Sequence, residues 1–298
     1  MIYPVDWVDA FTNRAFGGNG CAVVHDGGAV PPDQCATFTA ETGLVECTFI
    51  DPPETAEAHA KVRYFMASGE IPFAGHPTVA SVASLLHRGL IEGDSVCLET
   101  GAGLIDVRID RTDAAPWIEM TQIAPEFGPA IPASEVASAV GLSTADIVGQ
   151  PQVVSTGLPF CVTLVKDHET LARAHQTAAL ADFANTHAIP GVDLVYPYLL
   201  ALGGATNEGD TFARLLLGPP LPPEDPFTGS ATGATAAYLW RHGLIPEPKY
   251  VAEQGHGMGR PGRARVEVLG PPEAIEGVKV SGQAFVLMSG QLMLNRAQ

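Results

Sequence analysis

The sequence has few charged residues for its length, and positive ones are the scarcer kind. Of its 298 residues only 16% are charged, and 33 acidic against 16 basic residues give a net charge of −17. A chain this acidic, without a cluster of Lys and Arg, is a poor ligand for nucleic acid or an anionic membrane. We therefore expect neither as a partner. We expect a small anionic metabolite as the partner, and groups in its binding site would have to offset the repulsion from the net negative charge of the chain.

Cysteine and long apolar segments are also scarce. The five cysteines are odd in number and show no CxxC spacing, which favours buried thiols in a reducing compartment over disulfides. No apolar run approaches the roughly 18 residues that span a bilayer. The N-terminus lacks the basic start and apolar core of a signal peptide. The sequence therefore predicts a cytoplasmic protein.

Motifs for metals and cofactors are missing as well. The nine histidines show no metal-ligand spacing, and no P-loop lysine, HExxH or GxSxG occurs. Residues 257–262 match GxGxxG, but Pro261 interrupts them and a strand-like segment follows. A dinucleotide site needs a strand before this motif and a helix after it. We expect no metal and no cofactor.

The sequence does contain a duplicated element. Residues 70–91 and 224–245, which lie 154 positions apart, agree at 11 of 22 positions without a gap. Chance agreement in this composition would be about one or two positions. Each copy has a Pro-Phe-x-Gly turn, an Ala-rich apolar run and a final Gly-Leu-Ile. A helix that is apolar on all sides is a buried helix, so buried helices are predicted at 77–88 and 231–242.

The predicted elements run as strands, a long buried helix, then strands, and this order occurs twice. We therefore predict an α+β fold of two halves, each a sheet wrapped around a central helix. The Pro-rich segment 124–133 is the predicted boundary. Residues 1–124 would form the N-terminal half and residues 125–283 the C-terminal half. A return of the last strand, about 284–298, to the first half stays open.

The two copies differ where their helices begin. His76 follows the shared glycine Gly75 in the first copy, and Ser230 follows Gly229 in the second. Helix N-termini bind anions through free backbone N–H groups and the helix dipole. We therefore expect both helix starts to hold a small carboxylate in a cleft between the halves. The structural alternative is that Ser230 is an ordinary N-cap and His76 a satisfied turn residue.

Two acids add to this site. Glu46 lies in the apolar segment GLVECTFID, a predicted strand, where desolvation would raise its carboxyl pKa and improve it as a general base. Asp225 stands in the second copy where the first has Ile71. The structural alternatives are a glutamate on an edge strand and a turn aspartate before proline.

These residues fall within segments that resemble the PhzF-like (phenazine biosynthesis) family. The segments are VDAFTNRAFGGNG, LVECTFI, VRYFMASGEIPFAGHPT, EDPFTGSATG and EQGHGMGRPGR, in the family's order over residues 5–285. The resemblance implies a fold like that of diaminopimelate epimerase. That fold has two pseudo-symmetric halves, each a curved, mostly antiparallel sheet around a central apolar helix, with the active site between them. It also implies an isomerase that needs neither metal nor cofactor, and a homodimer.

The resemblance also assigns residues. By motif, Glu46 matches the family's proton-shuttling glutamate and His76 the histidine of its Gly-His-Pro turn. Asp225 and Ser230 match the acid and serine of its Asp-Pro-x-Thr-Gly-Ser motif. The best-understood members isomerise trans-2,3-dihydro-3-hydroxyanthranilate, so an isomerase of a small carboxylate is the leading hypothesis.

Other readings of the same fold stay open. Related epimerases and proline racemases use two cysteines, one before each repeated glycine, where this chain has Ala74 and Thr228. A two-thiol mechanism is therefore not expected. A thiol-independent epimerase or racemase, and a metabolite-binding protein without turnover, are the alternatives. Gly20 and Gly262 also depart from the family's usual proline and serine.

Overall fold

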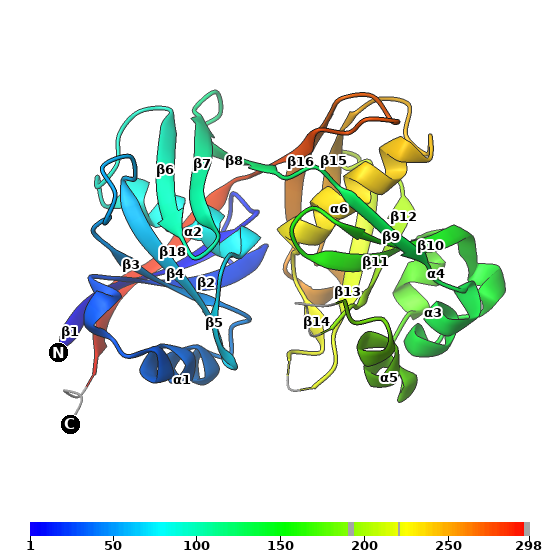
Figure 1. The fold of residues 1–298 in the computed structure, drawn as a ribbon, viewed down its shortest axis with the longest axis horizontal. Coiled ribbons are helices and arrows are strands. Elements are labelled where there is room, and N and C mark those ends of the chain that lie inside the picture. The colour runs from blue at the N-terminus through cyan, green and yellow to red at the C-terminus, as the bar shows by residue number, and fades with distance from the viewer. Residues whose placement is uncertain (190–193, 220, 295–298) are drawn as a thin grey trace. The chain divides into compact units, whose positions relative to one another are not determined.

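The computed structural model describes residues 1–189, 194–219 and 221–294 of the chain, which forms two compact units (Figure 1). The first unit consists of Met1–Met120 and the C-terminal segment that begins at Ser281. The second unit is Thr121–Val280. The chain leaves the first unit in β8 (Trp117–Gln122) and returns in β17 (Gly277–Gly282).

The first unit is built on a mostly antiparallel sheet. Its other strands are β1 (Ile2–Ala10), β2 (Asn19–His25), β3 (Cys47–Asp51), β4 (Ala60–Met66), β5 (Gly69–Ile71), β6 (Ser95–Thr100), β7 (Gly103–Asp110) and β18 (Ala284–Met293). They pair in the order β18–β1–β2–β3–β4–β6–β7–β8, with β2–β3 and β4–β6 parallel and the other pairs antiparallel. The short β5 pairs with β4. The C-terminal strand therefore lies beside β1, although residues 295–298 are outside the described residues.

The second unit repeats this pairing. Its strands are β9 (Glu126–Ala130), β10 (Ile147–Ser155), β11 (Pro159–Val165), β12 (Pro197–Leu202), β13 (Thr211–Leu216), β14 (Glu224–Asp225), β15 (Lys249–Gln254) and β16 (Gly262–Leu269). β9 to β13 pair in chain order, then β13 pairs with β15 and β15 with β16. Of these pairs, β11–β12 and β13–β15 are parallel and the others antiparallel. The short β14 pairs with β13 as β5 does with β4. The duplication therefore extends well beyond the 22-residue repeat, and the Pro-rich segment at 124–133 contains β9.

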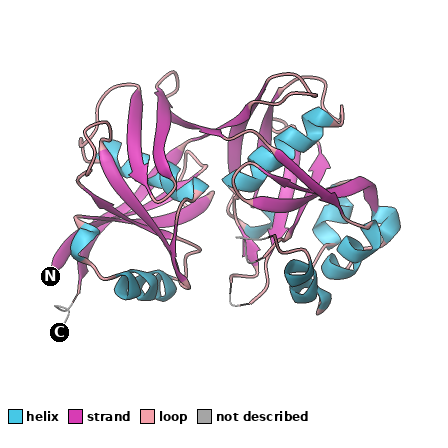
Figure 2. Ribbon diagram, in the orientation of Figure 1, coloured by secondary structure: helices cyan, strands magenta, loops and turns pink. Residues whose placement is uncertain are grey.

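Each unit has one long helix against its sheet (Figure 2). These are α2 (Gly75–His87) and α6 (Gly229–Arg241), which occupy equivalent positions of the repeat. α2 packs on β1, β2, β3 and β18, and α6 packs on β10, β11 and β16. Both were predicted as buried helices, but each begins two residues earlier and ends one residue earlier than predicted. The prediction assumed that Pro77 opens the helix, whereas Gly75 and His76 already have helical geometry.

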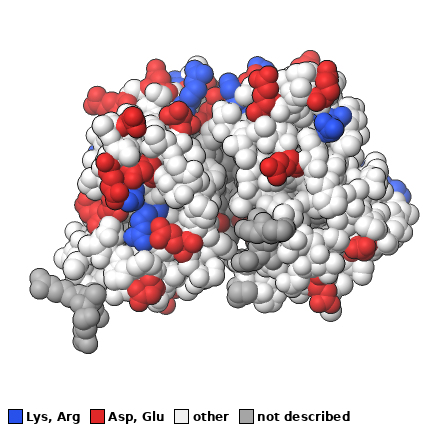
Figure 3. Space-filling view, in the orientation of Figure 1, with Lys and Arg blue, Asp and Glu red and all other residues white. Residues whose placement is uncertain are grey.

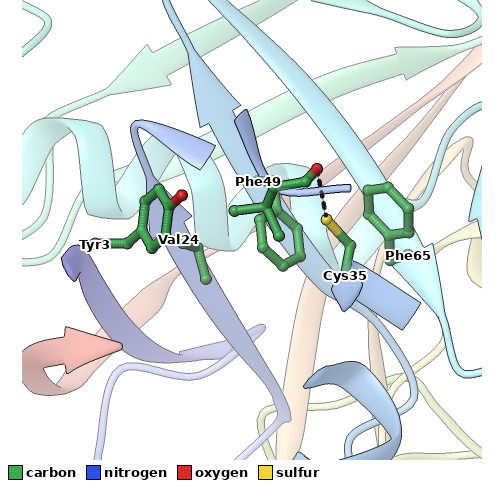
Figure 4. Packing of buried hydrophobic residues seen from close by; sticks show 6 residues of the cluster. Tyr3, Val24, Cys35, Phe49 and Phe65 are labelled. Carbon is green, nitrogen blue, oxygen red and sulfur yellow. Dashed lines mark hydrogen bonds between the residues drawn. The ribbon is translucent and has the colours of Figure 1, made fainter. Parts of the chain in front are cut away.

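Shorter helices surround these cores. They are α1 (Pro32–Thr42), α3 (Ala133–Val140), α4 (His168–Arg173), α5 (Ala179–Thr186) and the 3₁₀ turns Gly27–Ala29, Thr144–Asp146 and His256–Met258. α1 lies against β4 and β5. Its Cys35 joins Phe49, Phe65, Val24 and Tyr3 in an apolar cluster (Figure 4). The first sheet therefore buries side chains against α1 as well as against α2.

A buried polar cluster ties the end of α2 to the sheet. Asp6 of β1 is fully buried, and Arg88 donates to its two carboxylate oxygens from Nε at 2.6 Å and Nη2 at 2.7 Å. Ser84 Oγ donates to Asp6 at 2.6 Å and lies 2.7 Å from His25 Nε2. Burial alone would raise the pKa of Asp6, but the hydrogen bonds from Arg88 and Ser84 outweigh it and lower the pKa to about 2.

The outer surface agrees with the acidic composition. Asp and Glu side chains are spread over the face shown in Figure 3, with Lys and Arg among them. Within the described parts of the chain, no helix is long and apolar enough to cross a membrane.

Candidate functional site

The start of α2 leaves backbone donors outside the helical hydrogen-bond ladder. Ala74 occupies the N-cap position without a side-chain cap. The first intrahelical bond recorded at this end runs from Thr78 N to Ala74 O at 3.3 Å. Pro77, third in the helix, has no N–H to place. The amides of Gly75 and His76 therefore lack intrahelical acceptors, as expected at a helix N-terminus.

His76 is a buried imidazole with one nitrogen unused. The residue is only 5% exposed, and its Nδ1 lies 3.2 Å from Asn19 Nδ2 and 3.5 Å from Glu46 Oε2. Its Nε2 is buried and has no hydrogen-bond partner among the described residues. Burial lowers the pKa of His76 to about 3, so the ring is neutral near pH 7. The reading of His76 as a satisfied turn residue is therefore wrong.

Glu46 lies directly before β3, so its prediction as a strand residue was wrong. The strand begins at Cys47, and β3 has β2 on one side and β4 on the other. The alternative of an edge-strand glutamate is therefore wrong too. The Glu46 side chain is 15% exposed and meets His76 as described above. The first unit thus brings together Glu46, His76 and the amide of Gly75.

In the second unit, Asp225 is held by a buried network. The residue is 5% exposed and lies in β14, where it pairs with Leu215. Thr228 Oγ1 donates to Asp225 Oδ2, and Gln254 Nε2 donates to the Asp225 carbonyl at 2.7 Å. Asp225 is therefore a fixed residue at a strand end and not merely a turn residue before proline.

Gln254 is the centre of this network. Its Oε1 accepts from Thr228 N at 3.0 Å and from Tyr198 Oη at 2.9 Å. Its Nε2 lies 3.3 Å from Thr228 Oγ1 in addition to its bond to Asp225. Because the side chain is almost fully buried and uses both its donor and its acceptor, it fixes the segment that leads into α6. Sequence reasoning missed this residue, although it lies in the segment EQGHGMGRPGR.

Ser230 is not the N-cap of α6. That position belongs to Thr228, and Ser230 is the second helical residue and only partly buried. Thr232 N bonds to Thr228 O at 3.0 Å, so the amides of Gly229 and Ser230 precede the intrahelical ladder. The second unit thus brings Asp225, Gly229 and Ser230 to the start of α6.

A shared threonine locks both helix starts. Thr78 Oγ1 donates to Ala74 O at 2.7 Å, and Thr232 Oγ1 donates to Thr228 O at 2.9 Å. Tyr64 Oη also lies 2.8 Å from Thr78 Oγ1. Because each threonine hydroxyl holds the N-cap carbonyl in place, the first amides of each helix keep a fixed direction.

Neither Cys21 nor Cys47, two buried cysteines of the first unit, stands before a repeated glycine. Cys21 and Cys47 are buried, and burial raises the pKa of both thiols. The positions before the repeated glycines hold Ala74 and Thr228. Among residues 1–189, 194–219 and 221–294, no group of three His, Cys, Asp or Glu side chains could hold a metal ion.

The sequence pattern of the phenazine biosynthesis-like protein family (PhzC-PhzF) matches residues 8–290. The chain belongs to the PhzF-like family. A Clostridium acetobutylicum protein named as an uncharacterized isomerase is 28% identical, with 98% of this chain and 99% of that protein aligned. A Pseudomonas aeruginosa trans-2,3-dihydro-3-hydroxyanthranilate isomerase is also 28% identical, over 96% of this chain and 98% of the enzyme. The chain is an enzyme of the isomerase class.

Solved structures show the same fold. A predicted epimerase from Pseudomonas aeruginosa is 31% identical and superposes with a TM-score of 0.81, covering 98% of this chain and 100% of that one. A hydroxyproline epimerase from Agrobacterium vitis is 14% identical, with a TM-score of 0.64 over 98% of this chain and 91% of that one. The predicted diaminopimelate-epimerase-like α+β fold, with a curved and mostly antiparallel sheet around a central helix, is confirmed.

Proposed function

We propose that this protein is a cofactor-independent isomerase of a small carboxylate, in which Glu46 alone carries the proton. The observation that supports it most is Glu46 Oε2 at 3.5 Å from His76 Nδ1, at the start of α2, where the first backbone amides lack intrahelical acceptors. The reaction would resemble that of the trans-2,3-dihydro-3-hydroxyanthranilate isomerases among the relatives.

Glu46 would remove a proton from one carbon of the substrate and return it to another. No electron acceptor is needed, because the C–H bond broken is matched by a C–H bond formed and a double bond moves between them. A cationic imidazole near Glu46 would stabilise its carboxylate and weaken it as a base. Burial keeps His76 neutral, so its ring places no positive charge beside the Glu46 carboxylate.

The negative charge that develops on the substrate needs donors. The amides of Gly75 and His76 lie at the positive end of the α2 dipole, where preorganised N–H groups stabilise such charge. The unused His76 Nε2 would meet a polar group of the substrate. We propose that Asp225, Ser230 and the amide of Gly229 contribute to the same reaction from the second unit.

The test is proton exchange with solvent. Candidate carboxylates, beginning with trans-2,3-dihydro-3-hydroxyanthranilate, are incubated with the enzyme in D₂O, and deuterium uptake is followed by NMR. Glu46→Gln should lower turnover about 10²–10⁴-fold, since a positioned base contributes that much. Glu41→Gln, on the exposed end of α1, is the matched control. Unchanged turnover and deuterium uptake in Glu46→Gln would end this role for Glu46.

A thiol-independent epimerase is the second candidate, because the structure 31% identical to this chain is described as a predicted epimerase. Glu46 would then act with Asp225 or His76 as the second proton carrier. Scrambling of a substrate stereocentre without movement of a double bond would favour this reaction.

We also propose that the chain forms a homodimer, which the family resemblance implies. A chain of 31.1 kDa would then sediment at twice that mass at micromolar concentration. A monomer mass under these conditions would refute this assembly and would leave the proposed chemistry untouched.

A further inference from the structure

α6 contains a glycine in its interior that the first copy of the repeat does not have. Gly233 stands where the first copy has Val79, and glycine destabilises a helix interior relative to alanine. The structure gives a reason for it. A Cβ at position 233 would lie 1.8 Å from Gln122 Oε1 and 2.6 Å from Gln122 Cδ. Only glycine lets the Gln122 side chain lie across the first turn of α6.

Gln122 belongs to a chain of hydrogen bonds that ends at the start of α6. Thr156 Oγ1, on a residue 5% exposed, donates to Gln122 Oε1 at 2.5 Å. Gln122 Nε2 donates to the carbonyl of Gly229 at 2.9 Å. That carbonyl shares its peptide group with the N–H of Ser230. The amide orientation of Gln122 is settled by the contacts, because the Gly229 carbonyl can only accept.

Hydrogen bonds in series polarise one another. A donor on the Gly229 carbonyl draws electron density away from the Ser230 N–H and makes it a stronger donor. It also holds the Gly229–Ser230 peptide in one orientation. The first intrahelical bond at this end runs from Thr232 to Thr228, so the Ser230 amide is left to act outside the helix.

We propose that Gln122 and Thr156 are positioning residues that orient and strengthen the Ser230 amide for the negative charge of the carboxylate substrate. The proposal rests on the function proposed above and deepens it. The two helix starts then differ in donor strength as well as in side chains, because Val79 fills the corresponding place in α2. Gly233 destabilises the interior of α6 but makes room for the contact between Gln122 and the Gly229 carbonyl.

The decisive variant is Gly233→Ala. The new methyl group displaces the flexible end of Gln122, while alanine favours the helix. Because catalysis loses the polarised donor, kcat/KM with trans-2,3-dihydro-3-hydroxyanthranilate should fall about five- to tenfold, a fraction of what a whole oxyanion donor is worth. The melting temperature should stay equal or rise. In a Gln122→Ala background, the same substitution should leave kcat/KM unchanged. If Gln122 only stabilises the fold, Gly233→Ala should instead lower the melting temperature and leave kcat/KM unchanged.

Thr156 provides a second test with conservative rescue. Thr156→Val removes the hydroxyl, and Thr156→Ser keeps it. The ¹⁵N resonance of the Ser230 amide is compared in the ligand-free enzymes. It should lie upfield of its wild-type position in Thr156→Val and Gly233→Ala, and at the wild-type position in Thr156→Ser. The His76 amide, in the first unit, is the internal control and should not move.

The outcomes separate the two proposals. An unmoved Ser230 resonance in Thr156→Val overturns the polarisation. A moved resonance with wild-type kcat/KM overturns its use in catalysis. A wild-type enzyme that isomerises no carboxylate defeats the proposed function instead, and the NMR comparison still shows whether the Ser230 amide is polarised.

Discussion

The buried His76 predicts a specific loss of stability in mild acid. Burial lowers its pKa to about 3, against an ordinary value of 6.5 in the unfolded chain. Between these values only the unfolded state binds the proton, so stability falls as the pH drops below 6.5 and levels off near 3. At pH 5, about 1.5 units below the pKa of the unfolded chain, protonation stabilises the unfolded state by about 2 kcal/mol, since each unit contributes about 1.4 kcal/mol.

Urea denaturation from pH 7.5 to 5 measures this loss, and His76→Asn isolates it. The difference in unfolding free energy between wild type and His76→Asn should shift by about 2 kcal/mol over this range, in favour of the variant at pH 5. Thr78→Val is the matched control, because it weakens the same helix start without removing a titrating group. ¹⁵N NMR of the wild-type imidazole should report a neutral ring at both pH values. A ring that titrates near pH 6.5 in the folded enzyme would refute the reasoning.

Two further predictions concern the buried networks of the two units. Arg88→Met leaves the fully buried carboxylate of Asp6 without its ion pair and should cost about 3–5 kcal/mol of stability in thermal denaturation; a loss below about 1 kcal/mol would show that Asp6 had found another partner or become protonated. Gln254→Leu removes the side-chain acceptor of Thr228 N and of Tyr198 Oη inside the protein and should cost about 2–4 kcal/mol. In a Gln254→Leu enzyme that stays folded at 15 °C, kcat/KM should still fall, because Asp225 loses the contact that fixes its backbone; full activity there would contradict that role.

The repeat could be interpreted from sequence because its signal is local. An apolar face on every side and matching glycines predicted both buried helices, and they were found within two residues of the predicted bounds. The ends were wrong because proline at 77 is tolerated anywhere in the first helical turn, so its position does not mark the first residue. Ser230 is not an N-cap because the helix already begins at Gly229, which leaves the N-cap position to the extended residue Thr228.

Glu46 shows a different limit. Its place in the apolar segment GLVECTFID suggested a strand residue, but the strand starts one residue later, at Cys47. Glu46 and His76 are in contact although 30 positions separate them in the sequence, so no local sequence pattern could predict the contact. The family resemblance suggested each residue separately. Gln122, Thr156 and Gln254 escaped notice because an uncharged side chain has no periodicity or motif to mark it. Their importance lies in hydrogen bonds to distant backbone groups.

The sequence alone determined that this protein has two similar halves, two buried helices without thiols at their starts, and two acids and a histidine within family motifs. These follow from composition, spacing and side-chain chemistry, which are properties of the chain itself. Only the tertiary structure decided that His76 is neutral with a nitrogen unused, that Glu46 stands beside it, and that Gly233 makes room for Gln122. Burial and close approach depend on residues far apart in the chain, so they appear only once both sheets have closed on their helices.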